Sequence, residues 1–133
     1  MSRYTPNAAT AFAERDLGER CCERALRTTL TIDRARGLTE DLTVLAHPIR
    51  LQLLDLLSRH GGRVCVCDLE SAVPVKQPTV SHHLRILRDA GLVDCHRQGL
   101  WAYYLVRRDT LEALRRRVTT AVAGFGLIAG GGR

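Results

Sequence analysis

Apolar residues recur at helical spacing along most of this 133-residue chain, with turn-forming residues between the runs. The pattern predicts one or two helices over residues 7–36, with Gly37 as the C-cap, and a short helix over residues 39–46. Another helix begins at Pro48, because a proline in the first helical turn gives up no hydrogen bond, and the glycines at 61–62 end it. Its apolar face consists of Ile49, Leu53, Leu56 and Leu57.

The middle of the chain predicts a helix-turn-helix. Residues 63–67 are short and β-branched, which indicates an extended segment, and residues 68–73 predict a short helix that Pro74 stops. A second helix covers residues 77–90, with Pro78 in its first turn. One face of this second helix is apolar and the opposite face is polar and basic. The apolar face is formed by Val80, Leu84 and Leu87, with His83 beside it.

Residues 92–106 predict a β-hairpin whose turn spans residues 97–100, where Gly99 tolerates a positive φ. Alternation puts Trp101, Tyr103 and Leu105 on one face, and we expect the hairpin core to contain the aromatic residues Trp101, Tyr103 and Tyr104. A last amphipathic helix covers residues 109–123, with an apolar side of Leu111, Leu114, Val118 and Val122. These elements predict a mainly α fold with a β-hairpin wing, which is a winged helix-turn-helix.

The charge of the chain favours DNA as a partner. The net charge is +6 and the isoelectric point is near 9.5, and residues 76–108 alone carry +4. A recognition helix packs one face on its own domain and offers the other to the major groove. The few aromatic residues near the cations argue against single-stranded nucleic acid. The candidate DNA contacts are Gln77, Thr79, Ser81, His82, Arg85 and Arg88 on the helix, and Arg97 and Gln98 on the hairpin.

The cysteines carry the candidate chemistry. There are five of them, Cys21, Cys22, Cys65, Cys67 and Cys95. The sequence shows neither a secretory signal nor a membrane-spanning run, so we expect a cytoplasmic protein whose thiols are metal ligands, redox groups or core residues. If residues 65–67 are extended, Cys65 and Cys67 point to the same side. No Cys-x-x-Cys motif is present, which argues against a thiol enzyme.

Four motifs resemble the ArsR/SmtB family of metalloregulatory repressors. They are Val-Cys-Val-Cys-Asp-Leu at 64–69, Gln-Pro-Thr-Val-Ser-His-His-Leu at 77–84, Leu-Ala-His-Pro-Ile-Arg-Leu at 45–51 and Gly-Leu-Trp-Ala-Tyr-Tyr at 99–104. The resemblance implies a homodimer built through the terminal helices, which binds double-stranded operator DNA and releases it when an inducer binds. The corresponding division is an N-terminal helical arm with a cysteine pair (1–38), a winged helix-turn-helix domain for DNA binding and dimerisation (39–123) and a flexible Gly-rich tail (124–133).

The chain departs from that family at Glu70, where the best-known arsenic sensors have a third cysteine. The resemblance implies that Cys21 and Cys22 replace it, because some members recruit N-terminal cysteines, often from the other subunit. The family's other zinc site uses histidines of the C-terminal helix. It does not carry over, since no histidine follows His96. We therefore expect a metal site formed by Cys65, Cys67, Cys22 and Cys21.

Thiolate ligands select soft ions. Trivalent arsenic or antimony takes about three sulfurs in a pyramid, cadmium or lead three or four, and zinc four ligands in a tetrahedron. An adjacent cysteine pair combined with a Cys-Val-Cys box resembles arsenic sensors of the actinobacterial type, so we favour As(III) or Sb(III) as inducer. Two alternatives stay open at this point. One is a Cd(II), Pb(II) or Zn(II) response, and the other is a redox repressor that oxidises Cys21 or Cys22 with Cys65 or Cys67.

Overall fold

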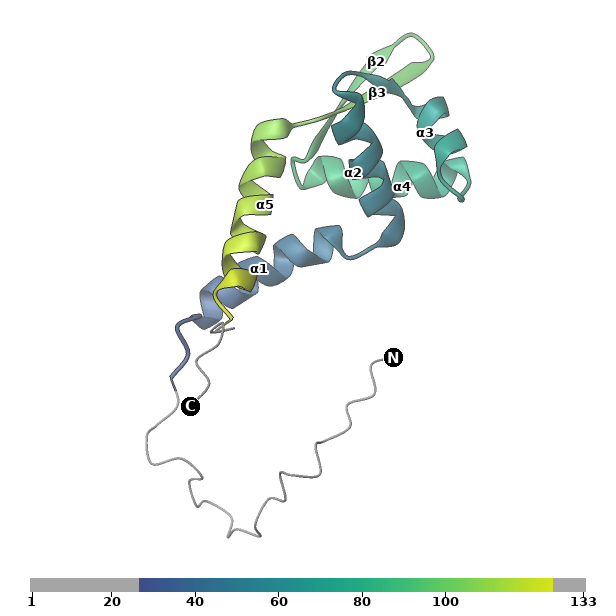
Figure 1. The fold of residues 1–133 in the computed structure, drawn as a ribbon. Helices are drawn as coiled ribbons and strands as arrows, with labels where there is room; N and C mark the ends of the chain where they lie inside the picture. Colours follow the sequence, from purple (N-terminus) through teal and green to yellow (C-terminus); the bar gives the residue numbers. More distant parts are fainter. Residues whose placement is uncertain (1–26, 126–133) are drawn as a thin grey trace, which may run out of the picture.

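The computed structural model describes residues 27–125, in which five helices and three short strands follow the predicted order (Figure 1). No helix in this range is long and apolar enough to cross a membrane. The predicted helix-turn-helix is confirmed, and the hairpin follows it directly. The elements are α1 (Ile32–Leu45), α2 (Pro48–His60), β1 (Val64–Cys65), α3 (Val66–Ala72), α4 (Gln77–Asp89), β2 (Val93–Gln98), β3 (Trp101–Val106) and α5 (Arg108–Ala123).

The first described helix corrects one boundary prediction. Gly37 does not end a helix, since α1 runs through it without a break from its N-cap, Thr31. The Thr31 hydroxyl accepts a hydrogen bond from the Arg34 N–H at 3.3 Å. A glycine stops a helix when the backbone turns left-handed there, and Gly37 is not among the glycines with positive φ. Residues 27–31 of the predicted 7–36 helical segment are not helical, and the part up to residue 26 lies outside the described residues.

Helix α2 has the predicted start and end. His47 is the N-cap, and its Nδ1 accepts a hydrogen bond from the Ile49 N–H at 3.2 Å. Pro48 occupies the first turn, and Gly61 ends the helix with a φ of 76°, which only glycine adopts without strain. The buried face of α2 consists of Ile49, Leu53, Leu54 and Leu57, so Leu54 joins the predicted stripe and Leu56 is only half-buried.

Helix α4 packs its predicted stripe into the centre of the molecule. Val80, Leu84 and Leu87 are fully excluded from solvent, and the helix packs against α2, α3 and β2. Immediately after the Gly91 turn, Leu92 and Val93 are also fully buried. The hydrophobic core therefore lies directly under α4. The core holds this helix by its apolar face.

The strands form an antiparallel sheet in the order β1-β3-β2, and Gln98 pairs with Trp101 across the hairpin turn. Of the three aromatic residues predicted for the hairpin core, Tyr104 is buried as expected, whereas Tyr103 is half-buried and Trp101 is exposed. Tyr104 and Val106 are the buried residues of β3, whereas Trp101 is 56% exposed. The register explains the difference, because Val106 lies opposite Val93, which enters the core straight from α4. Every second residue from Val106 then faces inward.

The extended prediction for residues 63–67 is also corrected. Only Val64 and Cys65 form a strand, paired with Tyr104 and Tyr103. The chain then turns into α3 at Val66, so Cys67 lies in the first turn of a helix. The sequence Asp68-Leu69-Glu70 explains this, since an acidic residue suits a helical first turn and Leu69, which is fully buried, anchors the helix on the core.

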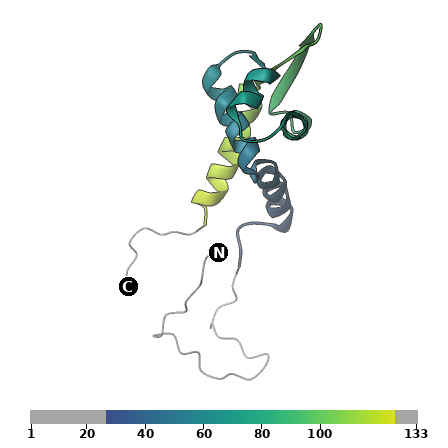
Figure 2. The ribbon, with the colours of Figure 1, turned by 90° about the vertical axis from the view of Figure 1, so that its right-hand side faces the viewer.

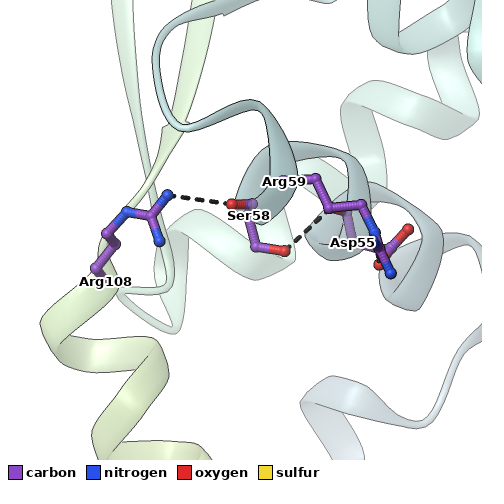
Figure 3. Close-up of polar contacts among 4 residues, drawn as sticks. All are labelled: Asp55, Ser58, Arg59 and Arg108. Carbon is purple, nitrogen blue, oxygen red and sulfur yellow. Dashed lines mark hydrogen bonds and ion pairs between the residues drawn. The ribbon is translucent and has the colours of Figure 1, made fainter.

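Helix α5 is bonded to two other helices. Figure 3 shows Arg108, at the start of α5, donating to the Ser58 carbonyl near the end of α2, at 3.1 Å. This places a cation at the negative end of the α2 dipole. Further along, Arg117 forms a bidentate ion pair with Asp41 of α1 at 2.8 and 3.0 Å. Helices α1 and α5 therefore lie side by side, while the hairpin projects from the opposite end of the molecule (Figure 2).

The depth of the core under α2 predicts a large effect of cavity formation. Leu53→Ala should lower the free energy of unfolding by about 2–5 kcal/mol, because Leu53 has no solvent exposure. Leu51→Ala in the same helix is the control, since Leu51 is 51% exposed and its loss should cost about 0.5 kcal/mol or less. Urea unfolding at one protein concentration measures both. Equal losses would contradict this account of the core.

Candidate nucleic-acid interface and thiol site

The outer face of α4 is a continuous polar surface. Gln77, Thr79, His82, Arg85 and Arg88 are exposed, and Ser81 is half-buried. The structure thus brings all six predicted helix residues onto α4, five of them open to solvent. No side chain caps the α4 N-terminus at Lys76, and the positive end of the helix dipole there favours an anion, although Pro78 has no N–H and the Thr79 N–H donates to the Lys76 carbonyl at 3.0 Å. Lys76 itself is exposed, and sequence reasoning did not include it among the candidate contacts.

The hairpin contributes a second basic element beside α4. Arg97 and Gln98 are exposed at the end of β2. Burial and a hydrogen bond with Cys95 raise the pKa of Tyr104, while the positive charges of Arg88 and Arg97 act on the same hydroxyl and lower it. Helix α4 packs on β2, so the two predicted sets of contacts lie on neighbouring elements.

Two other cations of the 76–108 stretch have partners within the chain. Arg107 pairs with Asp94 at 3.9 Å, and Arg108 is bonded to the end of α2. Within residues 27–125, Arg85, Arg88 and Arg97 form no ion pair. Charges without an internal partner are the ones available to an external polyanion.

Below this surface lies a buried guanidinium that sequence reasoning missed. Arg50 of α2 is 8% exposed. Its Nε donates to the Val44 carbonyl at 2.6 Å and its Nη2 to the Thr43 carbonyl at 3.0 Å, both in the last turn of α1. Its Nη1 is 3.1 Å from Nδ1 of His83 in α4. The sequence signal for this burial is an arginine directly after the core residue Ile49, in a helix that is otherwise apolar on its core side.

The contact with Arg50 fixes the protonation state of His83. Arginine has no acceptor, so His83 must accept through an unprotonated Nδ1 and carry its proton on Nε2. The His47 ring lies against it at a tilt of 36° with 4.0 Å between centroids, and the His82 ring meets its edge with 5.3 Å between centroids. Burial lowers the pKa of His83 below its usual range, and the positive potentials of His47, Arg50 and His82 lower it further.

The two box cysteines lie together in spite of the wrong extended prediction. Cys65, at the end of β1, is the residue that precedes α3, and Cys67 follows in its first turn. Their sulfur atoms are 2.6 Å apart, and Cys67 is exposed. The hydrogen bond to Cys65 raises the pKa of the Cys67 thiol, and the nearby Asp68 charge raises it too. Two adjacent sulfur donors of this kind suit one soft ion.

The described residues alone do not complete a metal site. No group of three or more His, Cys, Asp or Glu side chains is gathered for an ion within residues 27–125. Cys95 belongs elsewhere, half-buried against the core beside Tyr104. Glu70, at the departure from the family pattern, is half-buried with one carboxylate oxygen unpartnered. Cys21 and Cys22, the other predicted ligands, lie outside the described residues.

Comparison with known proteins identifies relatives of this chain. The family model for bacterial regulatory proteins of the arsR family matches residues 47–94, from the α2 N-cap to β2. A transcriptional repressor SmtB homolog of Synechocystis is 39% identical over 67% of this chain and 66% of its own length. A putative arsenical resistance operon repressor of Halobacterium salinarum is 35% identical over 80% of this chain and 93% of its own.

Solved structures agree with the sequence comparisons. The AntR antimony-specific transcriptional repressor is 29% identical with a TM-score of 0.56, covering 78% of this chain and 96% of its own. A homodimeric winged helix-turn-helix DNA-binding domain from Mycobacterium bovis is 25% identical with a TM-score of 0.53, covering 77% and 94%. The mainly helical fold with a hairpin wing is therefore shared with known DNA-binding domains.

The buried neutral His83 predicts a pH-dependent stability. Its pKa is lower in the folded state than the ordinary value of about 6.5, so the unfolded chain binds the proton first as the pH falls. Stability from this group is therefore complete above about pH 6.5 and declines as the pH falls below it. His83→Asn, which keeps an acceptor but does not titrate, should lose less unfolding free energy than the wild type between about pH 7.5 and 5.5. His96→Asn, an exposed histidine on β2, should behave like the wild type. Parallel curves for wild type and His83→Asn would refute the assignment.

Proposed function

The chain belongs to the bacterial arsR family of regulatory proteins, and on that premise we propose that it is a metalloid-responsive transcriptional repressor. It binds operator DNA as a homodimer and releases it when As(III) or Sb(III) binds its cysteine thiolates. One observation carries the proposal. A pair of sulfur atoms 2.6 Å apart stands at the start of α3, the first helix of the unit whose second helix, α4, exposes a polar and basic face.

In this proposal α4 enters the major groove with its N-terminus toward the backbone. Gln77, Thr79, Ser81 and His82 lie in its first two turns and bond base edges or phosphates. Arg85 and Arg88 neutralise phosphate or read guanine, and the positive end of the helix dipole favours phosphate. Arg97 and Gln98 of the wing contact the neighbouring backbone or the minor groove.

The dimer is proposed from surface that one chain leaves uncovered. Helix α1 has no fully buried residue, and α1 and α5, which pack on each other, both expose large apolar side chains. These are Ile32, Leu42 and Val122, followed by Phe125 just past the end of α5. A two-fold dimer through these helices would cover them and place two copies of α4 about 34 Å apart, in successive major-groove halves.

The inducer site is proposed to combine two segments of the chain. Cys65 and Cys67 would supply two thiolates, and Cys22 or Cys21 would supply the third that a pyramidal As(III) or Sb(III) requires. The relatives whose names refer to arsenic and antimony support this choice of ligand. Drawing the N-terminal segment onto α3 would shift a helix that packs against α4. Allosteric coupling of about 1–3 kcal/mol would lower operator affinity about 5- to 150-fold.

Two other inducers use the same residues. If Cys21 and Cys22 both bind together with the two cysteines of the box, the site has four thiolates, which would suit Cd(II), Pb(II) or Zn(II) instead. The other is an oxidant, since peroxide converts one thiol of Cys21 or Cys22 and one thiol of Cys65 or Cys67 into a disulfide and two waters. These readings differ in the reagent that releases DNA, so the same titration distinguishes them.

Arg85 tests the DNA-reading face. A duplex selected by the wild-type protein from a random-sequence pool supplies the operator. Arg85→Ala should weaken its binding and reduce the slope of log affinity against log salt by about 0.9, the value of one lost phosphate contact. Arg59→Ala removes an exposed arginine of α2 that pairs with Asp55 and should leave the slope unchanged. Identical slopes for Arg85→Ala and the wild type would exclude Arg85 as a phosphate contact.

Cys65 tests the inducer site. Sodium arsenite should release the selected duplex from the wild type, whereas Cys65→Ser should bind the duplex normally and fail to release it. Cys95→Ser should keep both properties, because Cys95 belongs to the hairpin core. Parallel titrations with antimonite, cadmium, lead, zinc and peroxide identify the inducer class. Loss of DNA binding in Cys65→Ser would show that the thiol is structural, and no release by arsenite would end the arsenic proposal.

A further inference from the structure

Arg50 is the side chain that connects three helices at one point. Helix α1 packs on α5 and α2, and helix α4 packs on α2, so α2 is the neighbour that the two share. The Arg50 guanidinium, carried by α2, hydrogen-bonds the last-turn carbonyls of α1 and the ring of His83 in α4. The position of the DNA-reading helix is thereby tied to the end of a helix in the proposed dimer interface.

The chemistry of this contact makes it sensitive to displacement. A buried guanidinium is costly unless its donors are all matched, and here every partner is neutral. The Arg50–His83 contact is 3.1 Å long, so a relative shift of about half an ångström would stretch it beyond hydrogen-bond range. A shift of α4 away from α1 therefore leaves a buried donor unsatisfied. This contact therefore favours one orientation of α4 and makes displaced orientations less stable.

We propose that Arg50 is a positioning residue for DNA reading, which acts through the neutral ring of His83 to hold α4 in its binding orientation against the end of α1. This inference rests on the proposed function, because it concerns the operator affinity of the same face. His83 directly follows the candidate contact His82 and lies two residues before Arg85. Holding the His83 ring in place therefore also holds the side chains of His82 and Arg85 in position.

The surroundings of His83 make the link sensitive to acid. The groups that act on its ring are His47 before α2, Arg50 of α2 and His82 of its own helix, and none of these is acidic. A proton on Nδ1 removes the acceptor and adds a positive charge beside Arg50. Acidification should therefore weaken operator binding by releasing α4.

The test compares the affinity of folded variants for the duplex that the wild type selects. Arg50→Lys retains the charge but loses the planar fork that serves three acceptors. We expect its affinity to fall at least about tenfold, which corresponds to about 1.4 kcal/mol. Arg59→Lys, the same change at an exposed position of α2, should bind like the wild type. His83→Leu should lose as much as Arg50→Lys, and the double variant should lose no more than either.

Thermal melts separate positioning from stability. Affinity is measured well below each melting temperature, where lost stability alone does not change the affinity of the folded protein. His83→Asn, which keeps an acceptor, should bind within about threefold of the wild type and lose less affinity on acidification. If folded Arg50→Lys and His83→Leu both bind as tightly as the wild type, the inference fails while the proposed function stands. If Arg50→Lys does not fold, His83→Leu alone decides. If the wild type selects no duplex, both proposals fail.

Discussion

The burial of one face of α4 is the constraint on which the rest of the molecule depends. Val80, Leu84 and Leu87 are fully enclosed, and they hold the helix by a single stripe on α2 and β2. The opposite face gives nothing to the core, so its residues can be polar and basic at no cost in packing. A helix held this way presents its side chains at fixed positions, which a DNA-reading element requires.

Helix α2 connects α4 to the end of α1. Its N-cap His47 packs its ring against His83, and its buried Arg50 joins the end of α1 to α4. On the other side of the unit, α3 begins at the paired thiols and packs on α4. A change at α1 and a change at the cysteines would therefore reach α4 through different neighbours. In the proposed repressor both would act on its orientation.

The order of the elements was predictable from the sequence because local patterns specify it: the spacing of Val80, Leu84 and Leu87, the proline at 48 and the glycine at 61. What failed depended on tertiary context. Both faces of β3 are apolar, so alternation could not tell which one is buried until the pairing of Val106 with Val93 decided it. The partners of Arg50 are backbone carbonyls and a histidine 33 residues away, which no local pattern reveals.

The central claim is that ligand binding at the thiols changes the DNA-reading helix, and amide hydrogen exchange of the full chain on its selected duplex tests it most directly. Bound DNA should protect the α4 and hairpin amides. Sodium arsenite should then protect the segment around Cys65 and Cys67 and restore free exchange to α4 and the hairpin. Protection at the cysteines with α4 still fully protected would contradict the account, because the ligand would have bound without reaching the helix.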